Sequence, residues 1–246
     1  MIHVVIPTLL SEKDYKNTVA FKCLNRLMQN AECNKNKLGF YYTILEKNKE
    51  GFCKLYNQFI ENDPVTNGDS IITFIHDDLE IYDQFFVEKL LKAHQSYDVV
   101  GLAGASSQDY TDLSRPLAWH LCMRNGQKDG RGFVSHGIPA NIAFPTAFIN
   151  ASYFGPTPAE AVFIDGVFMS FNAKNIRASG VYFNEKYTFQ HYDMSACADA
   201  KKIGLKIGVY PIFAIHHGLG DFNAEALWHT SAKEFRQDYG DYIISI

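Results

Sequence analysis

The sequence lacks the features that identify several large classes of protein. It has 246 residues and a formal net charge of −4, with no block of Lys and Arg, so we do not expect a nucleic-acid partner. No apolar run approaches the roughly 18 residues that a transmembrane helix requires. The first residues have neither the basic start nor the long apolar stretch of a signal peptide. We therefore expect no membrane span and no secretion signal.

The cysteines also lack a recognisable pattern. They are odd in number and scattered, and no two of them form a C-x-x-C pair: Cys23, Cys33, Cys53, Cys122 and Cys197. A disulfide framework or a zinc site is therefore not expected, and scattered reduced thiols are typical of a cytoplasmic protein. At this length, with 47% hydrophobic residues, the chain can form one large α/β domain or two small ones.

Strands and helices are predicted to alternate along the first half of the chain. Apolar runs predict strands at 2–8, 38–46, 70–78 and 98–106, and apolar residues at helical spacing predict helices at 11–31, 51–63 and 81–97. Ser11 is expected to cap the first helix, with Asp14 three residues later. This alternation is typical of a mostly parallel sheet flanked by helices.

The pattern changes after Ser106. A segment rich in Gly and polar residues predicts a long loop or loose hairpin at 114–137. Beyond it the sequence predicts strands at 161–172, 180–189 and 205–218, and a short helix at 192–204. We expect these pieces to add a smaller antiparallel portion to the same sheet, so that residues 1–246 form a single α/β domain.

Polar residues follow three of the predicted strands at the point where each strand ends. Pro7 and Thr8 end the first strand, Glu46 ends the second, and residues 76–78 end the third. In open α/β sheets, ligands bind in the crevice outside the carboxyl ends of the strands. The sequence therefore predicts a ligand site at this edge of the sheet.

The third strand ends in His76, Asp77 and Asp78. Two adjacent carboxylates repel each other and are costly to desolvate unless a cation compensates them. Oxygen donors with one imidazole suit a divalent ion such as Mn²⁺ or Mg²⁺. The alternative is a hydrated strand end in which Asp78 or Glu80 lies near the N-terminal dipole of the next helix. The two acids alone favour the hydrated strand end, because short acidic pairs are common.

Five short motifs occur in an order that is similar to that of a known family: HVVIPT, HDD, FIDGVFMSFN, HYDMSACADAKKIGLKI and HHGLGD. Together they resemble GT-A type glycosyltransferases of the family 2 kind, and HHGLGD resembles a segment of bacterial rhamnosyltransferase-like members. The resemblance covers nearly the whole chain. It implies a single GT-A (Rossmann-like) domain with a nucleotide-binding half at 1–106 and an acceptor-binding half at 107–246.

The resemblance also assigns residues to the nucleotide. Pro7 and Thr8 match the first nucleotide-contacting loop, and Glu46 stands where the family has an acid near the nucleobase. Asn57 matches an Asn that touches the nucleotide, and Asp77 lies inside the D-x-D-like signature for the metal and diphosphate. We expect these five residues to bind the nucleotide.

The expected metal ligands are His76, Asp78 and His217. His76 and Asp78 occupy the two ends of the D-x-D-like signature, so that a His stands where the family has its first Asp. His217 matches a late family histidine on the metal or the diphosphate. If the strand continues, His216 and His217 point to opposite faces, so only one of them can enter the site, and we expect His217 to do so.

The resemblance implies that Asp193 is the general base, with Asp165 on the acceptor side as the next candidate. Two neighbours depart from the family pattern, because Tyr192 replaces the usual Glu and Ser195 replaces a common second Asp. The implied protein is a metal-dependent, inverting hexosyl- or deoxyhexosyltransferase that uses Mn²⁺ or Mg²⁺. Its implied substrates are a nucleotide-sugar donor, with UDP favoured over GDP or dTDP, and a glycan, lipid-linked or protein acceptor.

Two alternatives to a glycosyltransferase remain. A sugar nucleotidyltransferase also uses an α/β fold and acids on a metal, but it usually has a glycine-rich loop after the first strand, and residues 6–17 contain no Gly. A non-catalytic nucleotide- or glycan-binding module is compatible with the substitutions at His76, Tyr192 and Ser195.

Overall fold

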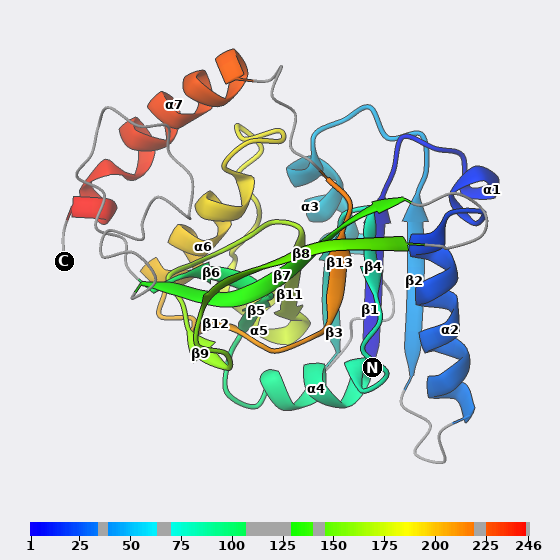
Figure 1. The fold of residues 1–246 in the computed structure, drawn as a ribbon. Coiled ribbons are helices and arrows are strands. Elements are labelled where there is room, and N and C mark those ends of the chain that lie inside the picture. Colours follow the sequence, from blue (N-terminus) through cyan, green and yellow to red (C-terminus); the bar gives the residue numbers. More distant parts are fainter. Residues whose placement is uncertain (34–38, 63–69, 107–128, 140–145, 219–224, 245–246) are drawn as a thin grey trace.

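The computed structural model describes residues 1–33, 39–62, 70–106, 129–139, 146–218 and 225–244 (Figure 1). Its central sheet has seven strands in the order β2 (Phe40–Leu45), β1 (Ile2–Pro7), β3 (Ile71–Ile75), β11 (Phe168–Asn172), β5 (Val99–Gly101), β12 (Ile207–Val209) and β9 (Ala159–Glu160). β1 is parallel to β2 and β3, and β12 is parallel to β5. β11 is antiparallel to both β3 and β5, so those two run the same way. The prediction of a mostly parallel sheet is confirmed.

A second sheet lies beside the first and is mostly antiparallel. Its order is β10 (Phe163–Ile164), β6 (Ala103–Ala105), β7 (Gly130–Pro139), β13 (Ala214–His216) and β4 (Leu79–Ile81), with β8 (Thr146–Gly155) paired to β7. Only β7 and β13 are parallel among these pairs. β4 and β6 come from the first half of the chain, so this sheet joins both halves of the sequence.

Seven helices flank the sheets in the described part of the chain: α1 (Glu12–Tyr15), α2 (Val19–Cys33), α3 (Phe52–Asn62), α4 (Phe86–Ala93), α5 (Ala173–Ser179), α6 (Tyr192–Lys202) and α7 (Glu225–Ile244). The Ser11 hydroxyl caps α1 by accepting a hydrogen bond from the Asp14 amide at 3.1 Å, as the sequence predicts. The helix then breaks, and the Thr18 hydroxyl accepts from the Phe21 amide at the start of α2. None of the helices among the described residues has the length and apolarity needed to cross a membrane.

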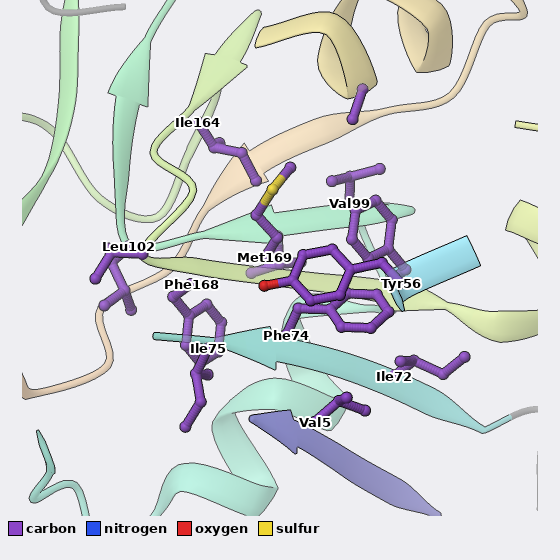
Figure 2. Packing of buried hydrophobic residues seen from close by; sticks show 14 of the residues in the cluster. Val5, Tyr56, Ile72, Phe74, Ile75, Val99, Leu102, Ile164, Phe168 and Met169 are labelled. Atoms are coloured by element: carbon purple, nitrogen blue, oxygen red, sulfur yellow. The ribbon is translucent and has the colours of Figure 1, made fainter. Parts of the chain in front are cut away.

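β3 lies inside the core, and its five residues are all buried. Burial of both faces is what a central strand between helices requires, and it explains the continuous apolar run in the sequence. Tyr56 of α3 stacks on Phe74 of β3 with ring centroids 3.9 Å apart (Figure 2). This packing holds the end of β3, and therefore the residues that follow it, in a fixed position.

Several predicted elements differ from the structure. Residues 180–189 form no strand, because the Asn57 side chain bonds both the amide and the carbonyl of Phe183 where a neighbouring strand would otherwise do so. The predicted strand at 205–218 is two strands, β12 and β13, in different sheets, interrupted near Pro211, which has no amide to donate. The predicted helix at 81–97 begins only at Phe86, after β4.

Candidate active site

The ends of β1, β2 and β3 lie at one edge of the central sheet, as the parallel pairing requires. Thr8 follows β1 and donates its hydroxyl proton to Asp77 Oδ2 at 2.6 Å, and the Leu10 amide donates to the same hydroxyl at 3.1 Å. Burial raises the pKa of Asp77, and the Thr8 hydrogen bond opposes this only in part. The expected proximity of Thr8 and Asp77 is therefore observed.

Glu46 lies at the same edge but already has a structural contact. Its Oε2 accepts a hydrogen bond from the Glu12 amide at 2.7 Å, which places the carboxylate at the N-terminus of α1. The Thr8 amide donates to the Leu45 carbonyl, and the Asn48 amide donates to the Thr8 carbonyl, so Pro7, Thr8 and Glu46 belong to one tightly bonded corner. Glu46 remains exposed to solvent.

His76, Asp78 and His216 form a group that we call the metal-side cluster. One possible ligand atom from each lies within 4.8 Å of the others. His76 and Asp78 follow β3, whereas His216 ends β13, which pairs antiparallel with β4 so that His216 lies opposite Leu79. The sheet pairing thus joins residues that are about 140 positions apart in the sequence.

The electrostatics of this cluster suit a cation. Burial would raise the pKa of Asp78, but the His216 ring holds it below its usual range, so the carboxylate is ionised. Burial and the nearby His216 charge lower the pKa of His76. Asp78 Oδ1 is buried, 3.3 Å from His216 Nε2, and accepts no hydrogen bond within the described part of the chain. Two imidazoles and an ionised carboxylate are a donor set that fits a divalent transition metal.

His217 lies away from this cluster. Its Nε2 is 2.7 Å from Glu80 Oε1, and both side chains are nearly inaccessible to solvent. The two neighbouring histidines therefore point to opposite faces, as predicted, but His216 lies beside Asp78 where we expected His217. The alternation of side chains along a strand predicts that the two histidines point to opposite faces. It cannot tell which histidine points into the site.

Gly218 packs directly against the metal-side cluster. A Cβ at this position would lie 2.7 Å from His216 Nε2 and 3.1 Å from Asp78 Oδ2. A side chain at this position would therefore force the His216 ring to shift. The glycine of the HHGLGD motif thus has a packing reason at this site.

Asp165 and Asp193 form a second group, the base-side pair. Asp193, in the first turn of α6, accepts hydrogen bonds from the Gly166 amide at 3.0 Å and the Met194 amide at 2.8 Å. Burial, and next the charge of Asp165, raise the pKa of Asp193 to about 7. Each of its oxygens accepts one of these bonds and keeps a further lone pair. Asp193 is therefore a carboxylate that can accept a proton near neutral pH.

Asp165 connects the two groups. Its Oδ1 accepts a hydrogen bond from the Val167 amide at 2.9 Å, in the turn between β10 and β11. Its charge acts on His76 and His216 as well as on Asp193. The metal-side cluster and the base-side pair therefore lie close to one another, so the fold brings together the sequence motifs that contain them.

Asn57 does not lie at this edge. Its amide donates to the Phe183 carbonyl at 2.8 Å and to Glu185 Oε1 at 3.0 Å, while its oxygen accepts from the Phe183 amide at 2.8 Å. Both amide protons are used within the protein, so Asn57 serves the fold, and the structure gives no support to the expected nucleotide contact.

No protein-family model and no curated protein sequence matches the chain. Among solved structures, the mannosyltransferase PcManGT from Pyrobaculum calidifontis, in complex with GDP-Man and Mn²⁺, is similar with a TM-score of 0.52 and 13% identity, over 98% of this chain and 64% of that one. S. aureus TarS (TM-score 0.44, 14% identity, 88% of this chain and 60% of that one) is also similar. So is the catalytic domain of Drosophila beta1,4-galactosyltransferase 7 with xylobiose (0.47, 9%, 85% and 63%).

The chain spans less than two thirds of the length of each of these three structures. The likeness to the mannosyltransferase extends over nearly all of this chain, and at this level of identity it concerns the fold. The chain has the fold of GT-A glycosyltransferases, which confirms the fold class implied by the sequence motifs.

Proposed function

We propose that this chain is a metal-dependent glycosyltransferase that moves a sugar from a nucleotide-diphosphate sugar to an acceptor hydroxyl. The observation that supports it most strongly is the convergence of the metal-side cluster and the base-side pair beside the strand ends of a GT-A fold. Ionised Asp78 beside two imidazoles suits a cation, and buried Asp193 suits a proton acceptor. These are the two demands of glycosyl transfer to a hydroxyl.

The donor would bind along the edge formed by β1, β2 and β3. In this proposal Pro7 and Thr8 contact the nucleotide, Glu46 lies near the base, and Asp77, oriented by Thr8, lies toward the sugar-phosphate side. The exposed Glu46 carboxylate has a second oxygen that is not used at the α1 N-terminus. Residues 1–106 supply this donor half, and residues 107–246 supply the acceptor half.

His76, Asp78 and His216 would hold the metal ion, and the two imidazoles favour Mn²⁺ over Mg²⁺, which prefers an all-oxygen environment. When bound, such an ion neutralises the charge that grows on the departing diphosphate. His217 is excluded from this set in our proposal because it pairs with Glu80.

Asp193 would act as the general base. It removes the proton of the acceptor hydroxyl while the acceptor oxygen forms its bond to the anomeric carbon and the bond from that carbon to the diphosphate oxygen breaks. The proton ends on Asp193, and the nucleoside diphosphate leaves with the bonding electrons. Attack from the side opposite the leaving group inverts the anomeric configuration. Burial, and next the charge of Asp165, keep the pKa of Asp193 high enough for this role.

A donor panel tests the proposal. The full chain is incubated with Mn²⁺ and UDP-, GDP- or dTDP-linked hexoses and deoxyhexoses, and slow release of the nucleotide is followed without acceptor. GDP-mannose belongs in the panel because the mannosyltransferase of the same fold is in complex with it, and dTDP-rhamnose because of the HHGLGD segment. Release of nucleoside diphosphate from one donor is the expected result.

Two other outcomes would contradict the proposal. Release of pyrophosphate would indicate a sugar nucleotidyltransferase, and saturable binding of a nucleotide without release from any donor would indicate a binding module. An acceptor screen with glycan, lipid-linked and peptide hydroxyls then follows the donor that is turned over. A cytoplasmic location remains a prediction from the cysteines alone.

A further inference from the structure

Two residues that depart from the family pattern are in contact. His76 stands in place of the first Asp of the metal signature, and Tyr192 stands in place of a Glu beside the base. His76 Nε2 lies 3.0 Å from Tyr192 Oη, although the two residues are far apart in the sequence. Tyr192 Oη also lies 2.7 Å from the Gly166 carbonyl oxygen.

The direction of these two hydrogen bonds follows from the number of protons available. A carbonyl oxygen cannot donate, so the single phenolic proton of Tyr192 points to Gly166. Tyr192 Oη must then accept from His76, which requires the proton of a neutral His76 ring to be on Nε2. Nδ1 is left as the unprotonated nitrogen, and an imidazole coordinates a metal through its unprotonated nitrogen.

The Tyr192 hydroxyl is fixed by packing. The residue is 4% exposed, and its ring packs edge-on against Phe52 with centroids 5.5 Å apart. A Cβ at position 166 would lie 2.3 Å from Tyr192 Oη, so only Gly166 allows the hydroxyl to reach the carbonyl. The hydroxyl therefore cannot move with the His76 ring, and the ring must adjust to it.

We propose that Tyr192 is a positioning residue that holds His76 in the Nε2-protonated tautomer and presents Nδ1 to the metal ion. Gly166 extends the chain of contacts, because its carbonyl accepts from Tyr192 and its amide donates to Asp193. The metal side and the base side are thus joined through the backbone of one residue, Gly166. The inference rests on the metal site of the proposed function and is independent of the sugar and the acceptor.

Tyr192→Phe tests the inference because it removes the hydroxyl and keeps the ring. The affinity for Mn²⁺ alone, measured by electron paramagnetic resonance without nucleotide, is expected to fall about 10- to 100-fold. Tyr56→Phe is the matched control. Tyr56 is a buried tyrosine of the same aromatic cluster, and its ring centroid is 6.2 Å from that of Tyr192. Among the residues that the structure describes, its hydroxyl has no hydrogen-bond partner. Equal Mn²⁺ affinities of wild type and Tyr192→Phe would overturn the inference.

The tautomer supplies a readout that needs neither metal nor activity. Nitrogen-15 NMR of the metal-free wild type is expected to show His76 protonated at Nε2, and Tyr192→Phe is expected to lose this preference. A wild-type His76 protonated at Nδ1 overturns the inference even if the variant fails to fold. Wild-type protein that binds no Mn²⁺ overturns the metal site together with the inference. Expected results in both assays without turnover of any donor would instead reject the proposed function alone.

Discussion

The two acidic groups of the site differ in the direction in which the protein shifts their pKa values. On the metal side, the His216 ring keeps the pKa of Asp78 low in spite of burial. On the base side, burial and the charge of Asp165 raise the pKa of Asp193 to about 7. Two carboxylates whose pKa values are shifted in opposite directions can take different roles: one stays ionised, and the other can exchange a proton. The opposite shifts support a metal-ligand role for Asp78 and a general-base role for Asp193, and each role can be tested separately.

The largest effect is expected on the base side. Asp193→Asn keeps an acceptor for one of the two amides but removes the basic group, so donor turnover with acceptor should fall about 10²- to 10⁴-fold. Affinity for nucleotide and Mn²⁺ should change little, as measured by calorimetry. Glu61→Gln, an exposed carboxylate on α3, is the matched control and should retain the wild-type rate. A near wild-type rate for Asp193→Asn would transfer the base role to Asp165.

The metal side is tested by a pair of neighbouring substitutions. His216→Asn should weaken Mn²⁺ binding by about 100-fold, because it removes one of the three proposed ligands. His217→Asn should leave Mn²⁺ affinity unchanged and instead lower the free energy of unfolding by about 1–3 kcal/mol, since it disturbs the buried contact with Glu80. The reverse result would show that His217, and not His216, is the ligand.

Much of the fold was predictable because the evidence is local. The alternation of apolar runs and helical stripes predicts β1, β2 and α3 within a residue or two, and β3 within three, since each buries an apolar face that its own sequence displays. Local sequence patterns fail where the hydrogen bonds of a segment are decided by residues far away in the sequence. Residues 180–189 carry buried apolar side chains, yet Asn57 satisfies the backbone at Phe183 and no strand forms.

The same limit applies to the candidate site. The resemblance directs attention to Asp78, Asp165 and Asp193, which the structure brings close to one another. It could not choose His216 over His217, because that choice depends on which face of β13 is turned when it pairs with β4 and β7. The contact between His76 and Tyr192 was equally hidden, since each appeared only as a substitution in its own motif.

A smaller effect is expected from the glycine beside the metal side. Gly218→Ala introduces a Cβ 2.7 Å from His216 Nε2, and the histidine ring, as the end of a flexible side chain, is expected to rotate away from Asp78. Mn²⁺ affinity should fall about tenfold, at the lower end of the range for groups that orient a ligand. Gly180→Ala is not a suitable control because Gly180 has φ +66, whereas Gly240→Ala on α7, where a Cβ meets nothing within 4 Å, is suitable. Unchanged affinity would show that the ring position is not critical.

The smallest effect concerns pH and links the two acids of the base-side pair. If Asp193 must be ionised to accept a proton, the rate at saturating donor and acceptor should rise with pH through a midpoint near 7. Asp165→Asn removes a negative charge that favours the protonated form of Asp193, so the pKa of Asp193 should fall and the midpoint should move to lower pH. Below neutral pH, the variant should then keep a larger fraction of its maximal rate than the wild type does. Above pH 8, where Asp193 is ionised in both proteins, a lower rate of the variant would show a separate role of Asp165. A midpoint that does not move, in a variant that still turns over, would mean that the titrating group is not Asp193. Removal of the Asp165 charge must lower the pKa of Asp193.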